Sequence, residues 1–178
     1  MGSAMARSAR LRRSRDFYRA ILDTQPQIVH FCGHGAEDGI VLEDNTGQIA
    51  FVQADALSGM FKLFARKGVE CVLLNACYSE VQAQAISQHI EYVIGMNRQI
   101  GDKAAINFAV AFYDALAAGE EMEFAYELGC SQLIGLKEHQ TAVLKKKSLN
   151  HPIAGKTLEM PEGTMDSQSA FYVELQMF

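Results

Sequence analysis

The chain has 178 residues, 49% of them apolar and 21% charged, which fits one ordinary folded domain with a sizeable core. Its net charge of −5 argues against nucleic acid as the main partner, and no apolar run is as long as a membrane span. No secretory signal pattern is present, so its four cysteines are expected to be reduced thiols in a cytoplasmic protein.

The N-terminus divides into a short remnant and a basic segment. Residues 1–5 look like an expression scar rather than part of the fold, and five arginines stand within residues 7–15. Apolar residues over 11–23 predict an amphipathic helix. We therefore expect residues 6–26 to be a basic segment with a helix, followed by one domain over 27–178.

Strands and helices alternate through the chain up to Leu136, which predicts parallel strands joined by helical crossovers in an α/β sandwich. Strands are predicted at 27–32, 69–74 and 92–95, a β-hairpin at 39–51, and helices at 54–66, from Ser79 to about His89, from Asp102 to Gly119 and at 120–134. Beyond Leu136 the pattern weakens. The lysines at 145–147 predict a loop, and only 171–175 alternates like a strand.

The first strand of the domain ends in Gly33-His34-Gly35, which delivers a polar side chain to its carboxyl end. Glycine on both sides lets the backbone turn sharply and leaves the amides uncovered. A dinucleotide-binding G-x-G-x-x-G begins here but fails at Asp38. His30 lies inside the apolar run and is expected to be a hydrogen-bonded core histidine.

The second strand ends in a cysteine, Cys77. Carboxyl ends of neighbouring strands share one edge of an open α/β sheet, so His34 and Cys77 are expected to lie together, as a thiol nucleophile and its base require. Ser79 and Gln82 have the spacing of a capping box. A helix is therefore expected to begin just after Cys77, where its free amides would favour a thiolate.

The other three cysteines lack this placement. A buried cysteine is more often structural than reactive, so Cys32, Cys71 and Cys130 are expected to pack in strands or on a helix, and Cys77 to be the one exposed thiol. A zinc site made by His30, Cys32, His34 and Cys77 is a weaker alternative. Ligands two residues apart along an extended strand are awkwardly spread, so neither a metal nor another cofactor is expected.

Two motifs in this order identify a family. His-Phe-Cys-Gly-His-Gly at 30–35 followed by Leu-Leu-Asn-Ala-Cys-Tyr-Ser at 73–79 resembles the CHAT domains, prokaryotic relatives of caspases and separase. The resemblance covers about residues 27 to 135. It implies a caspase-like three-layer α/β sandwich with a mostly parallel sheet and a cysteine endopeptidase activity. By that resemblance Cys77 is the nucleophile, His34 is the general acid/base, and the amides of Gly35 and Cys77 hold the oxyanion.

The resemblance also suggests specificity and partners. Gly101-Asp102-Lys103 is similar to a setting in which separase holds the substrate's arginine, which implies that Asp102 lines an acidic S1 pocket; from the pattern alone Asp102 is expected to be a helix N-cap. The partners implied are a protein substrate and an attached sensor in prokaryotic defence or cell death. A catalytically silent peptide-binding scaffold remains an alternative. Family members usually carry another strand and helix ahead of the histidine strand, so the chain is either an excised domain or lacks an edge element.

Overall fold

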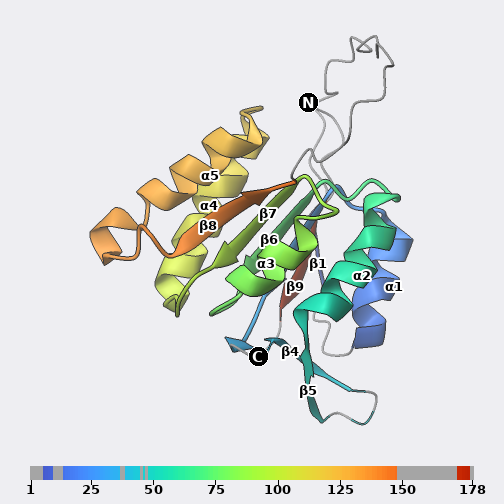
Figure 1. Cartoon of the computed structure of the whole chain (residues 1–178). Coiled ribbons are helices and arrows are strands. Elements are labelled where there is room, and N and C mark those ends of the chain that lie inside the picture. Colours follow the sequence, from blue (N-terminus) through green and yellow to red (C-terminus); the bar gives the residue numbers. More distant parts are fainter. Residues whose placement is uncertain are drawn as a thin grey trace, which may run out of the picture.

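A six-stranded sheet forms the centre of the protein (Figure 1). The computed structural model describes residues 6–9, 14–36, 39–44, 46, 48–147 and 172–176. The strands lie in the order β1-β9-β2-β6-β7-β8. Their bounds are β1 Ala6–Ala9, β2 Ile28–Cys32, β6 Cys71–Asn75, β7 Tyr92–Met96, β8 Ala142–Lys146 and β9 Tyr172–Gln176. All neighbours are parallel except β7 and β8, which are antiparallel.

Helices cover both faces of this sheet (Figure 1). One face carries α1 Ser14–Thr24, α2 Ala54–Ala65 and α3 Glu80–Ile86, and the other carries α4 Asp102–Ala117 and α5 Met122–Ser131. The central strands are apolar on both faces, as buried parallel strands are. In β2, Val29 and Phe31 pack with α1 and α2, whereas Ile28 packs with α4. The predicted three-layer α/β sandwich with a mostly parallel sheet is confirmed.

A second, three-stranded antiparallel sheet follows the histidine strand. It consists of β3 Gly35–Ala36, β4 Gly39–Glu43 and β5 Ile49–Val52. The turn between β4 and β5 is built on Asp44, whose Oδ1 accepts hydrogen bonds from the Thr46 amide at 2.7 Å and the Gln48 amide at 3.0 Å. The predicted hairpin is therefore present, and its turn is fixed by a side chain.

The predicted elements differ from the structure most clearly in four places. The lysine-rich stretch predicted as a loop is the edge strand β8, because lysines are common on the edge of a sheet, where they discourage further pairing. The helix α3 ends at Ile86 and not near His89. The helix predicted at 120–134 ends at Ser131, and a separate 3₁₀ turn spans Ile134–Leu136. A strand, β1, stands ahead of α1 where none was predicted.

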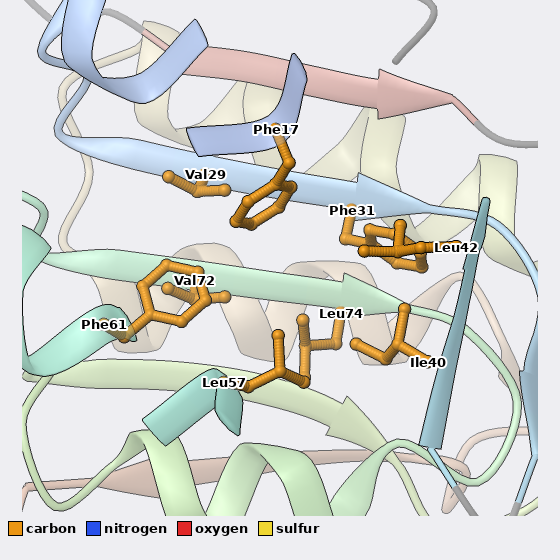
Figure 2. A pocket seen from close by; sticks show the side chains of 9 residues that line it. All are labelled: Phe17, Val29, Phe31, Ile40, Leu42, Leu57, Phe61, Val72 and Leu74. Atoms are coloured by element: carbon orange, nitrogen blue, oxygen red, sulfur yellow. The ribbon is translucent and has the colours of Figure 1, made fainter. Parts of the chain in front are cut away.

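The core under α1 and α2 contains one small gap (Figure 2). Its volume is about 10 Å³, room for no more than one water-sized group. The lining is wholly apolar and comes from α1, α2, β2, β4 and β6: Phe17, Val29, Phe31, Ile40, Leu42, Leu57, Phe61, Val72 and Leu74. Such a gap is a packing defect and not a ligand site. No helix in the described ranges is long and apolar enough to cross a membrane.

Candidate active site

The carboxyl ends of β2 and β6 meet at one edge of the sheet, as predicted for parallel neighbours. Cys32 is in register with Asn75, the last residue of β6. The Gly33 amide then donates to the Asn75 carbonyl oxygen at 3.4 Å, so the pairing runs one residue past the strand end. The loop that carries His34, after β2, and the loop that carries Cys77, after β6, therefore leave the sheet side by side. We call them the histidine loop and the cysteine loop.

The loops touch at Gly35 and Cys77. A Cβ atom built on residue 35 would collide with the Cys77 carbonyl oxygen and would lie 3.1 Å from the Cβ of Ala76. Only glycine permits this approach, because any side chain would need the space that the Cys77 peptide fills. His34 lies between this contact and the Gly33 hydrogen bond, and it is exposed. The structure thus brings both predicted residues onto adjoining loops.

Neither amide predicted to hold an oxyanion, that of Gly35 or that of Cys77, is taken up by a backbone partner among the described residues. Val41 donates its amide hydrogen to the His34 carbonyl oxygen at 3.1 Å, and the next pair of the β3–β4 ladder is Gly35 with Ile40. Antiparallel pairs alternate between hydrogen-bonded and non-hydrogen-bonded, so the Gly35 amide points away from β4. The Cys77 amide has no hydrogen-bond partner among the described residues.

The Cys77 side chain is half-buried, and its sulfur contacts the loop after β7. The thiol donates to the Ile100 carbonyl oxygen at 3.9 Å, and the next amide, Tyr78, donates to the Arg98 carbonyl oxygen at 3.3 Å. Tyr78 has a positive φ of 57°, a conformation that is unfavourable for a bulky residue. In the described part of the chain, no hydrogen bond joins the thiol to His34. The cysteine loop thus turns sharply at Tyr78 and is held by hydrogen bonds to the segment 97–101.

Ser79 ties the strand ends together from inside the protein. Its hydroxyl donates to the Leu74 carbonyl oxygen and accepts from the Met96 amide, both at 3.0 Å. The helix α3 begins at Glu80, as predicted, but the expected capping box is wrong, because Ser79 makes no side-chain cap bond. Its hydroxyl instead satisfies two buried backbone groups, which would otherwise be costly. Sequence spacing marked this residue but assigned it the wrong partner.

Asp102 is exposed at the first position of α4. It is not the N-cap: that residue is Gly101, and no side chain of the first turn caps the helix. The Gly101 amide donates instead to Oε2 of Glu138 at 3.1 Å. Asp102 follows two residues after Ile100, so it belongs to the same edge as Cys77. Glu138 was missed in the sequence, because no local pattern links it to a residue so far back in the chain.

The other cysteines differ in burial. Cys71 is fully buried, and burial raises the pKa of its thiol. Burial also raises the pKa of Cys130. Cys32 and Cys130 are nevertheless half-buried, as Cys77 is. The expectation that Cys77 alone would be exposed is therefore wrong, since strand ends and helix edges leave all three partly accessible.

His30 is a core residue, as predicted, with 3% of its surface exposed. Its ring lies 5.7 Å from that of Tyr113, and burial lowers its pKa to about 4. The predicted hydrogen bond is not found: neither ring nitrogen has a partner within the described ranges. Those ranges also contain no group of three or more His, Cys, Asp or Glu residues that could hold a metal ion. Within these ranges, the four residues of the zinc alternative are therefore not gathered into such a group.

Comparison with known proteins gives a family and several relatives. The CHAT domain model matches residues 5–154. A Roc-COR-CHAT protease from an unknown prokaryotic organism is 27% identical over 124 residues, covering 66% of this chain and 12% of that protein. A Roc-COR-CHAT protease from Runella zeae is 33% identical over 111 residues, covering 60% and 12%. A probable protease from Gillisia limnaea is 27% identical over 116 residues, covering 64% and 20%.

The chain spans between 12% and 20% of the length of these relatives. The family match, in contrast, covers most of the chain and includes both loops of the candidate site. Together with the parallel sheet and the two adjoining loops, this match identifies the chain as a member of the CHAT domain family.

Proposed function

We propose that this chain is a cysteine endopeptidase domain in which Cys77 is the nucleophile and His34 the general acid/base. The observation that carries the proposal is the backbone contact between Gly35 and Cys77, which fixes the histidine loop against the cysteine loop. A thiol nucleophile and a base need such proximity. The protease names of three relatives support the same activity.

The reaction would follow from these positions. His34 takes the thiol proton as the Cys77 sulfur attacks the scissile carbonyl carbon, and the amides of Gly35 and Cys77 donate to the resulting oxyanion. The carbon–nitrogen bond then breaks, and the proton passes from His34 to the leaving amine. A thioester to Cys77 remains. Water attacks it, His34 takes the water's proton, and the carboxylic acid product leaves as the thiol is restored.

Regulation by an attached or bound sensor is part of the proposal. In the structure the thiol donates to the Ile100 carbonyl oxygen, so it must turn away from the 97–101 loop before His34 can take its proton. Two relatives named Roc-COR-CHAT proteases are far longer than this chain, which supports a regulator encoded beside the peptidase. A role in prokaryotic defence or cell death is the setting we propose.

For specificity, we propose cleavage of protein substrates after a basic residue. Asp102 lies two residues beyond the carbonyl that contacts Cys77 and is exposed. A carboxylate at this place would pair with an arginine side chain in two parallel hydrogen bonds. Lysine would bind less well, because it presents a point charge and not a planar fork.

A covalent probe and a peptide library test the activity together. A peptidyl ketone with arginine at P1, carrying an acyloxy leaving group, should label Cys77 in the wild type but not in Cys77→Ala or His34→Ala. The control is Cys130→Ala, which should be labelled and should cleave library peptides as the wild type does. If peptides bind but neither labelling nor cleavage occurs in the wild type, the chain is a silent scaffold and the proposal fails.

A further inference from the structure

The segment 97–101 lies between the cysteine loop and the loop that precedes β8. On one side, Arg98 and Ile100 accept hydrogen bonds from Tyr78 and Cys77 through their carbonyl oxygens. On the other side, the Asn97 amide donates to the Thr141 carbonyl oxygen at 2.9 Å. The segment is therefore the physical link between the thiol and the 137–141 loop.

Glu138 contacts the segment 97–101 at Gly101, beside the residue that binds the thiol. Its Oε2 accepts from the Gly101 amide at 3.1 Å, and a Cβ on residue 101 would lie 3.3 Å from Oε1. Gly101 is the residue next to Ile100, whose carbonyl oxygen holds the thiol.

Glu138 supplies what α4 lacks in its own first turn. In a capping box, the acid at the third helical position reaches back to the amide of the N-cap. Here that position is Ala104, which has no such group, and the N-cap is Gly101. A carboxylate from 37 residues away takes this role.

The carboxylate is itself carried on a fixed backbone. The Glu138 amide donates to the Leu133 carbonyl oxygen at 3.1 Å, and its carbonyl oxygen accepts from Thr141 at 2.9 Å. The preceding residue, Lys137, closes the 3₁₀ turn in the left-handed conformation. Glu138 therefore joins the end of the α5 region to the segment that holds the thiol.

We infer that Glu138 is a positioning residue: by binding the Gly101 amide, it fixes the 97–101 segment and thereby orients the Cys77 thiol. The inference rests on the proposed role of Cys77. It assigns Glu138 no contact with the substrate. Its action depends on the reach of the carboxylate and on an acceptor oxygen, and not on negative charge as such.

Two conservative variants separate reach from charge. Glu138→Gln keeps the reach and an acceptor oxygen but removes the charge, whereas Glu138→Asp keeps the charge and is one methylene shorter. Glu120→Asp, an exposed acid after the end of α4, is the matched control. Three quantities are measured: hydrogen exchange of the Gly101 amide, the rate of Cys77 alkylation by iodoacetamide, and kcat and KM on an arginine peptide.

We expect Glu138→Asp to speed Gly101 exchange and Cys77 alkylation about fivefold, since one hydrogen bond is lost. Its kcat should rise by at most about the same factor while KM stays nearly constant, because the thiol must leave Ile100 before His34 can take its proton. Glu138→Gln and Glu120→Asp should stay within about twofold of the wild type. The inference is overturned if Glu138→Gln behaves as Glu138→Asp does, or if Gly101 exchange rises without any change at Cys77. Exchange and alkylation do not require cleavage, so they decide the inference even if the chain proves to have no peptidase activity.

Discussion

The carbonyl oxygen of Cys77 occupies the space that a Cβ atom on residue 35 would need. This contact joins two loops that leave different strands, and it is made by backbone atoms on both sides. Side-chain rotation therefore cannot relieve a clash there. The separation of the histidine and cysteine loops depends on glycine at position 35.

Gly35→Ala should push the two loops apart. We expect it to lower the free energy of unfolding by about 1–3 kcal/mol, as overpacking does. The rate of cleavage should fall further than the loss of folded protein accounts for. Gly59→Ala is the control, because nothing lies within 4 Å of a Cβ at that exposed position of α2. It should raise stability by about 0.5–1 kcal/mol. Chemical unfolding and a peptide assay measure both effects, and normal cleavage by Gly35→Ala would contradict the role of the contact.

The thiols should differ in reactivity. Cys77 is half-buried at a strand end, whereas Cys71 is fully buried and burial raises its pKa. Because the thiolate is the reactive form, Cys77 should alkylate in the native protein much faster than Cys71. Peptide mapping by mass spectrometry after a short pulse of iodoacetamide measures the rates, and unfolded protein gives the reference. Equal native rates at both sites would mean that the cysteine loop is closed.

Asp102→Ala tests the basic specificity. If Asp102 holds the P1 arginine, the variant should lose most of its preference for arginine over leucine at P1. Its melting temperature should change little, because Asp102 makes no side-chain cap bond. Asp114→Ala, which removes another exposed acid of α4, should retain the preference. An unchanged P1 profile in Asp102→Ala would leave this residue with no role in specificity.

His30 should make stability depend on pH. Burial lowers its pKa from 6.5 to about 4, so the unfolded chain binds the proton more readily than the folded protein does. The contribution of neutral His30 to stability is fully present above pH 6.5 and is lost as the pH falls toward 4, by about 3 kcal/mol. His30→Leu should remove this part of the pH dependence, as chemical unfolding between pH 4 and 7 would measure.

A different outcome at His30 has a specific meaning. If the wild type gained stability between pH 7 and 6, the imidazole would be charged in the folded state. The assignment of a neutral buried His30 would then be wrong.

Local pattern was sufficient for most of the sheet and for the two motif residues. Apolar runs, one ending in a glycine turn and the other in a cysteine, predicted β2 and β6, and the parallel arrangement then placed His34 and Cys77 at one edge. Strand β8 was missed because Lys145 and Lys146 indicated a loop. An antiparallel edge strand needs no long apolar run, so the sequence contains little that predicts it.

Long-range contacts could not be predicted in this way. Ser79 has the spacing of a cap, but its hydroxyl satisfies Leu74 and Met96, which only the folded sheet brings near. Glu138 caps a helix that begins at residue 102. Such contacts depend on the tertiary position of two segments, and a single sequence carries no periodicity that records them.

The position of β9 also constrains how the protein folds. Residues 172–176 lie between β1 and β2, so the two strands nearest the N-terminus have no contact with each other in the sheet. During synthesis, which proceeds from the N-terminus, β2 has an open edge until residue 176 has left the ribosome. An open apolar edge can pair with another chain. The sheet beside the histidine strand is thus completed last, and a nascent or truncated chain is the form most exposed to aggregation.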